Sequence, residues 1–149
     1  MAREHDSMAL WRRGAVATAG AIAVNLAILA TALTTGVSLR IPVFGGADVA
    51  QVGAGPVVMF TVVPMVLGLL AATLARRWSG GLRVVRVAAV VVLLVSLAPP
   101  LTIAADTATR LVLALMHPVA GGAFLLAVRS PRPAAGGARN VVGTGGAAT

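Results

Sequence analysis

Three residues whose types can do chemistry share one face of an apolar stretch in the last third of the chain. Asp106, Arg110 and His117 follow one another at intervals of four and seven residues. On a helix these intervals turn by about 40° and about 20°, so the three side chains lie on one face. Asp106 and Arg110 also have the i, i+4 spacing of an intrahelical ion pair. The spacing therefore predicts either a shared polar pocket or an ion pair that caps the start of a helix.

Two more polar residues, Asn25 and Ser96, lie within other apolar stretches. Polar side chains inside a membrane are costly, and each is a candidate functional residue. His117 falls near the middle of its stretch, about level with Asn25, where it would act as a proton relay or touch a ligand. The alternative is that His117, Asn25 and Ser96 bond across helices and fix their packing. The functional hypothesis is a pocket open to the outside and lined by all five residues.

Several kinds of chemistry are excluded by residues that the chain lacks. It has no Cys, so it has no thiolate metal site, iron–sulfur cluster or dithiol redox pair. No HExxH, Walker A or GxSxG motif is present. No Glu lies in an apolar stretch, and His117 is the one His there, which argues against a carboxylate di-metal site or a bis-His haem. We therefore expect no catalytic residue, metal or cofactor, and an intramembrane enzyme ranks third, behind a binding module and a transporter.

The composition places these residues in a membrane. Of 149 residues, 58% are hydrophobic and 11% are charged, and the mean hydropathy is +0.96. A soluble domain with so few charges could not cover its own surface. The sequence thus indicates an integral membrane protein and argues against a water-soluble enzyme.

Four apolar runs are long enough to cross a bilayer, which requires roughly 20 residues. Because backbone polar groups must be paired inside lipid, these runs must be helices. Pro99–Pro100 is the strongest break between the third and fourth runs. We predict an all-α membrane protein with a four-transmembrane-helix bundle over residues 14–128, its helices covering about 14–35, 55–77, 82–98 and 101–128.

The segment between the first two spans has the pattern of a short β-hairpin. Apolar residues alternate over Val37–Val43, Gly45–Gly46 provides a turn, and Asp48–Val52 follows. We expect this hairpin-like loop to lie on the extracytoplasmic surface. Residues 129–149 are rich in Pro, Gly and Ala and are expected to form a disordered cytoplasmic tail.

The arginines are distributed unevenly between the two sides of the predicted spans. All 12 basic residues are Arg, and 10 of them fall on the side of the two termini, against Arg40 and Arg110 on the other side. The positive-inside rule then places both termini, including residues 1–13, in the cytoplasm of a cell whose inner membrane holds the protein. The first span is longer than the apolar region of a signal peptide, so we expect it to be retained rather than cleaved.

The same arginines and the small residues of the first span suggest partners. A basic cytoplasmic face favours anionic lipid headgroups, and topology explains the arginines without any nucleic acid. Small residues repeat every four positions in the first span, which lets helices approach closely. That spacing serves either packing within the chain or a homo-oligomer; it is shown by Ala15, Ala19, Ala23 and Ala27, and also by Ala17 and Ala21.

Two segments carry a resemblance to a known family. Ser96-Leu-Ala-Pro-Pro100 and the stretch from Asp106 to Leu115-Met-His117 resemble a group of small four-span actinobacterial membrane proteins that are known only as a domain of unknown function. The resemblance covers about residues 10–130. It implies a four-helix membrane bundle and no activity.

Two hypotheses for the function remain. The first is a multi-pass membrane protein that serves as a binding or accessory module, with a membrane protein partner recognised at the outer loop and the outer helix ends. The alternative is a small oligomeric transporter or channel that uses Asp106, Arg110 and His117 along a polar, outward-facing path.

Overall fold

Four long apolar helices and one two-stranded hairpin make up the computed structural model, which describes residues 2–42 and 48–129. The elements, in chain order, are α1 (Ala2–Thr34), β1 (Arg40–Pro42), β2 (Val49–Gln51), α2 (Ala54–Ala75), α3 (Gly81–Ser96), α4 (Ala98–Thr102) and α5 (Thr107–Ala127). Within this described part, four helical stretches are long and apolar enough to cross a membrane: Met8–Thr34, Ala54–Ala75, Gly81–Thr102 and Thr107–Ala127. The predicted fold class is confirmed.

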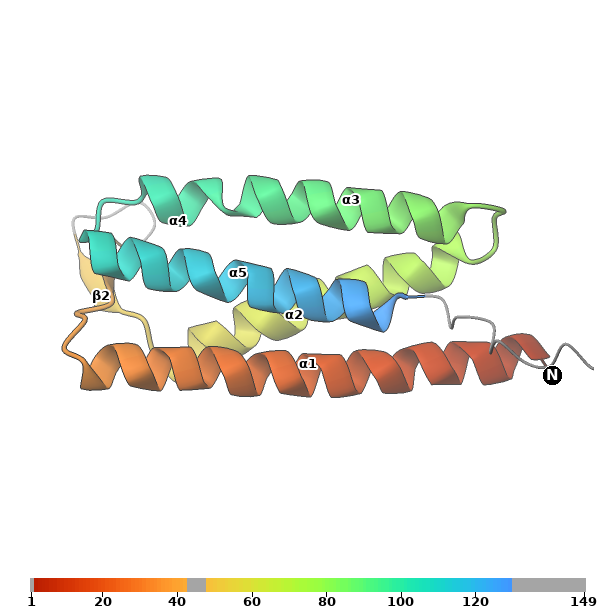
Figure 1. Ribbon diagram of the computed structural model, residues 1–149, viewed down its shortest axis with the longest axis horizontal. Coiled ribbons are helices and arrows are strands. Elements are labelled where there is room, and N and C mark those ends of the chain that lie inside the picture. The colour runs from red at the N-terminus through yellow and green to blue at the C-terminus, as the bar shows by residue number, and fades with distance from the viewer. Residues whose placement is uncertain (1, 43–47, 130–149) are drawn as a thin grey trace, which may run out of the picture.

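The helices run alternately up and down. Figure 1 shows α5 between α1 and α3, with α2 passing behind it. One end, here called the hairpin end, holds β1, β2, α4 and the first residues of α2 and α5. The opposite end, here called the arginine end, holds the turn between α2 and α3 and the last residues of α5.

The hairpin forms between the first two spans, as the alternating pattern predicts. β1 and β2 pair antiparallel, with Ile41 opposite Ala50 at the centre of the register. The predicted first strand was longer, and the structure replaces its first half with a tight bend at Leu39, whose φ is +47°. That bend turns the Leu39 side chain fully inward, where it closes the apolar cluster at this end. The predicted Gly45–Gly46 turn lies outside the described residues, as does the predicted tail.

The predicted break at Pro99–Pro100 is wrong, and the fourth long helix begins at Thr107 rather than Leu101. Both prolines are accommodated in the first turn of α4, where a helix has no use for their missing N–H groups. The chain leaves the helical conformation at Ile103 and α5 starts after Asp106. The first helix also starts earlier than predicted, at Ala2 rather than residue 14.

Two apolar clusters fill the interior, one toward each end. The cluster at the arginine end consists of Leu10, Met65, Leu69, Ala72, Phe124 and Val128. The cluster at the hairpin end consists of Leu29, Ala32, Leu39, Val52, Val57 and Met116. Glycines allow the helices to approach closely, because a Cβ at Gly14 would overlap Leu69 and one at Gly68 would overlap Phe124.

The tight turn between α2 and α3 depends on two glycines. Gly80 has φ +82°, which disfavours other residues, and a Cβ at Gly81 would overlap the carbonyl of Ala75. We expect Gly81→Ala to lower the free energy of unfolding by about 2 kcal/mol, because the overlapping atom is backbone and cannot rotate away. Titration with a denaturing detergent, followed by circular dichroism, measures this. Gly55→Ala is the matched control in open space and should lose nothing; equal losses in the two variants would contradict the account.

Candidate functional site

Asp106 does not form the expected ion pair with Arg110; it caps α5 instead. Its Oδ1 accepts a hydrogen bond from the Thr109 backbone N–H at 2.9 Å, and its Oδ2 accepts one from the Thr109 hydroxyl at 2.7 Å. The Ser38 hydroxyl donates a further bond to Oδ2 at 3.0 Å. The carboxylate therefore joins the start of α5 to the segment before the hairpin, and three donors already occupy it.

These hydrogen bonds stabilise the charged form of the carboxylate. The bond from the Thr109 hydroxyl, followed by that from the Thr109 backbone, lowers the pKa of Asp106 from 3.8 to about 2. Asp106 thus stays ionised across the physiological range. The carboxylate does not pair with Arg110, four residues on, because as an N-cap residue it accepts hydrogen bonds from Thr109 in the first turn of the helix.

Arg110 is left without a counter-charge. Its side chain is half-buried one turn into α5, and the buried Nε has no hydrogen-bond partner in the structure. Within residues 8–42 and 48–129 the acidic side chains are Asp48 and Asp106, and neither forms an ion pair with this guanidinium. A buried donor without an acceptor costs free energy, so this group is the least satisfied polar side chain of the hairpin end.

Asn25 is bonded across helices, as the packing hypothesis requires. It is 2% exposed, and its Nδ2 donates to Thr61 Oγ1 of α2 at 3.1 Å. The Thr61 hydroxyl donates in turn to the Val57 carbonyl at 2.8 Å. The Asn25 Oδ1 is buried without a partner. Thr61 was noticeable in the sequence only as a polar residue within a span, and its partner could not be chosen without the helix register.

His117 and Ser96 each bond to a carbonyl of their own helix. His117 Nδ1 lies 2.8 Å from the Leu113 carbonyl, and since a carbonyl only accepts, Nδ1 carries the proton and donates. Ser96 donates to the Leu93 carbonyl at 2.7 Å. Neither forms the bond to another helix that is expected if these residues fix the helix packing. His117 Nε2 makes no hydrogen bond with the part of the chain that the structure describes.

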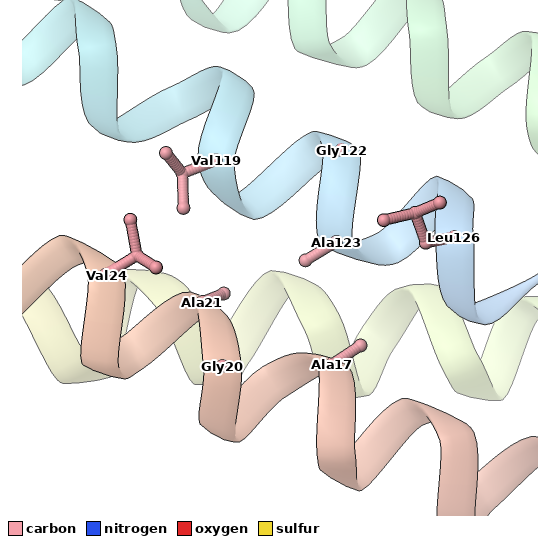
Figure 2. A pocket seen from close by; sticks show the side chains of 8 residues that line it. All are labelled: Ala17, Gly20, Ala21, Val24, Val119, Gly122, Ala123 and Leu126. Carbon is pink, nitrogen blue, oxygen red and sulfur yellow. The ribbon is translucent and has the colours of Figure 1, made fainter.

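The register places four of these polar groups at one level of the bundle. Across the α1–α5 contact, Val24 lies opposite Val119 and Ala17 opposite Leu126 (Figure 2). Asn25 therefore falls level with the turn of α5 that carries His117. Across the α3–α5 contact, Gly121 meets Leu93 and Arg86 reaches the Val128 carbonyl, which puts Ser96 at the same level. This level, with Thr61 bonded to Asn25, separates the two apolar clusters.

The predicted pocket is therefore two separate arrangements. Asp106 and Arg110 lie at the hairpin end, and His117 is eleven residues further along α5 than Asp106, about 16 Å away at 1.5 Å per residue. Asp106, Asn25, Ser96 and His117 share no hydrogen-bond partner: Asp106 is bonded to Thr109 and Ser38, and the other three to Thr61, Leu93 and Leu113 in turn. No three side chains of the metal-ligating types come together within the described residues.

The structure also contains an apolar groove that the sequence pattern did not single out. It lies between α1 and α5 and has a volume of about 410 Å³ (Figure 2). Its lining residues are mostly small: Ala17, Gly20, Ala21, Val24, Val119, Gly122, Ala123 and Leu126. Ala17 and Ala21 lie in the groove, whereas Ala15, Ala19, Ala23 and Ala27 are exposed on the outer face of α1. Of the alanines with this spacing, Ala17 and Ala21 therefore lie at the contact between α1 and α5, and the other four do not.

Arginines hold the arginine end of α5 in place. Arg86 of α3 donates to the Val128 carbonyl through Nε at 3.2 Å and Nη2 at 2.9 Å. Arg13 of α1 donates to the next carbonyl, that of Arg129, at 3.1 Å. The last carbonyls of a helix lack intrahelical donors and carry partial negative charge, so cations from two neighbouring helices stabilise this end.

Comparison with known proteins identifies the family. The model of a family of unknown function, DUF6069, matches residues 5–134, so the chain belongs to this family. No curated protein and no solved structure matches the chain.

The capping carboxylate makes the hairpin end sensitive to acid. Because the folded-state pKa of Asp106 is about 2 and its ordinary value is 3.8, its contribution to stability is fully present above the ordinary value and is lost as the pH falls through about 2. We expect the Thr109 amide resonance, followed by NMR in detergent micelles, to titrate with a midpoint near 2. Asp106→Asn should abolish this titration, and a midpoint at 3.8 or above would show that the carboxylate is not bonded as described.

Proposed function

We propose that this member of the family is a multi-pass inner-membrane protein that acts as a binding or accessory module, with its recognition surface at the hairpin end. The single observation that supports this most strongly is the Arg110 guanidinium, half-buried at the start of a span and without a counter-charge. Cations in spans are costly and usually pair or serve a function. The neighbouring carboxylate is engaged by Ser38 and Thr109, and no other acid of the described residues pairs with Arg110, so we infer that a partner supplies the counter-charge.

The hairpin end, where Arg110 lies, is suited to recognition because contacts within the chain already hold it in place. Leu39 is fully buried beneath the hairpin, and Ser38 is bonded to Asp106 of α5. A guanidinium on such a support meets a carboxylate with little further loss of conformational freedom, and the planar fork favours a bidentate contact. The partner we propose is a membrane protein that presents an acidic side chain at this depth.

The distribution of charge supports the proposed orientation. The described arginines at the hairpin end are Arg40 and Arg110, and those at the arginine end are Arg12, Arg13, Arg76, Arg77, Arg83, Arg86 and Arg129. Such a bias favours an orientation with the arginine end in the cytoplasm and the hairpin end outside. In that orientation the arginine end also faces anionic lipid headgroups.

The rival function, a small oligomeric transporter or channel, has one observation in its favour. His117 Nε2 has no hydrogen-bond partner in the described residues, and it lies at the level of Asn25 and Thr61 in the middle of the spans. A transport path requires water to reach this level. An enzyme is favoured by neither arrangement, because Asp106 and His117, whose types do acid–base chemistry, lie far apart on α5.

The binding proposal predicts loss of a partner when Arg110 loses its charge. We expect protein purified from native membranes in mild detergent to retain one membrane protein, and Arg110→Gln to reduce its amount at least tenfold, a factor that corresponds to about 1.4 kcal/mol. Quantitative mass spectrometry of the purified complexes measures this. Arg40→Gln, which removes an exposed arginine at the same end, is the matched control and should retain the partner.

Two outcomes would contradict the proposal. In the first, Arg110→Gln and Arg40→Gln retain the same proteins as the unchanged chain. In the second, the unchanged chain carries lipid alone in native mass spectra from nanodiscs as well as after purification in detergent.

A further inference from the structure

The groove between α1 and α5 faces outward along the bundle. Five of its eight lining residues are Gly or Ala, and all eight are apolar. Figure 2 shows the side chains of Val24 and Val119 meeting at one end of the groove, while its middle holds only the methyl groups of Ala21 and Ala123 beside Gly20 and Gly122. In a bilayer such a surface is covered by something apolar from outside the chain.

Gly20 and Gly122 are the unexplained feature of this groove. A Cβ at Gly14, Gly68 or Gly121 would overlap a neighbouring side chain, so those glycines permit helix contacts within the protein. A Cβ at Gly20 or Gly122 would meet nothing within 4 Å. Glycine within a helix costs roughly 0.5–1 kcal/mol relative to Ala. Packing within the chain does not explain this cost, whereas a molecule lying in the groove would.

Two arginines stand at the arginine end of the groove. Arg13 precedes the lining residue Ala17 by one helical turn, and Arg129 follows the lining residue Leu126 by three residues. The Arg13 guanidinium is held between α1 and α5, because it donates to the Ala9 carbonyl at 3.2 Å and to the Arg129 carbonyl at 3.1 Å. A guanidinium has five N–H donors, so donors remain for a further acceptor.

No acid offsets this charge within the part of the chain whose side chains are described. The acidic side chains there, Asp48 and Asp106, both belong to the hairpin end. An anionic group beside Arg13 and Arg129 would thus meet attraction from two guanidiniums, about one helical turn from the start of an apolar groove. A phosphate joined to an acyl chain has this combination of charge and length.

We propose that the α1–α5 groove binds one acyl chain of an anionic phospholipid whose phosphate lies between Arg13 and Arg129. The proposal adds a specific lipid site to the proposed function and rests on its cytoplasmic placement of the arginine end. A second copy of the chain is the less suitable occupant. Two copies related by an axis along the membrane normal would bring four of these arginines together at one level, with like charges repelling.

The test measures lipid binding by native mass spectrometry of the delipidated full chain in detergent, titrated with phosphatidylglycerol or phosphatidylcholine. We expect one saturable site that prefers phosphatidylglycerol by roughly 30-fold, the factor expected from two arginines near an anionic headgroup. Arg129→Gln should reduce this preference by about fivefold. Arg77→Gln, which removes an exposed arginine in the turn at the same end, is the matched control and should leave it unchanged.

Filling the groove tests the acyl chain separately. We expect Gly122→Leu to weaken the binding of both lipids at least tenfold, because its side chain enters the open space that the acyl chain would occupy. Gly55→Leu, also in open space but on α2, should bind as the unchanged chain does. The expected melting temperature of Gly122→Leu is unchanged or higher, since leucine favours helix more than glycine does.

The proposal is overturned if Gly122→Leu binds lipid normally, if the two lipids bind equally, or if the groove holds a second copy, seen as a dimer that Gly122→Leu dissociates. Failure of the proposed function would be seen in different measurements. If the arginine end, at Arg77, is labelled from outside the cell, the proposed cytoplasmic placement of that end is wrong even when the purified protein binds phosphatidylglycerol as expected. If Arg110→Gln retains every partner, the recognition surface is wrong while the lipid site stands.

Discussion

The absence of water inside a bilayer is the constraint on which the rest of this structure depends. A polar group there that has no hydrogen-bond partner within the protein lowers the stability of the fold. Thr61 accepts a hydrogen bond from the Asn25 Nδ2 across two helices, whereas His117 and Ser96 bond to carbonyls of their own helices. With its few polar side chains occupied in this way, the interior packs as two apolar clusters on either side of one polar level.

The two ends of the bundle use charge in opposite ways. At the arginine end, Arg13 and Arg86 cover the last carbonyls of α5, so cations complete a helix terminus. At the hairpin end, Asp106 completes the start of the same helix, and Arg110 is left over. The chain therefore stabilises α5 at both termini by itself. We assign binding to Arg110 at the hairpin end and to Arg13 and Arg129 at the arginine end.

Hydropathy predicts the spans well because a bilayer requires about 20 apolar residues whatever their detailed packing. Alternation predicts the hairpin for a similar reason, since Val37, Ile41 and Val52, on either side of the turn, pack in the cluster around Leu39. The ion pair predicted between Asp106 and Arg110 does not form. Their i, i+4 spacing permits such a pair, but it does not show that Thr109 and Ser38 donate hydrogen bonds to the same carboxylate. Ser38 is 68 residues away in sequence, so no local pattern could have found it.

The groove could not have been predicted either, because it depends on which faces of α1 and α5 meet. Alanines recur every four residues on two faces of α1, and the sequence does not say which face packs: Ala17 and Ala21 line the groove, whereas Ala15, Ala19, Ala23 and Ala27 are exposed. Glycines likewise look alike in a sequence. A Cβ at Gly121 would overlap Leu93 and one at Gly122 would meet nothing within 4 Å, a difference that only the register of three helices reveals.

A binding module that recognises its partner at the hairpin end requires no water path to the middle of the bundle, whereas a transporter requires one. The most direct measurement is thiol labelling of His117→Cys in intact and inverted membrane vesicles, since the unchanged chain has no Cys. Asp48→Cys, exposed at the hairpin end, serves as the positive control. The account predicts that a membrane-impermeant reagent labels residue 48 from one side and residue 117 from neither. Labelling of residue 117 from either side would contradict it and would favour a transport path.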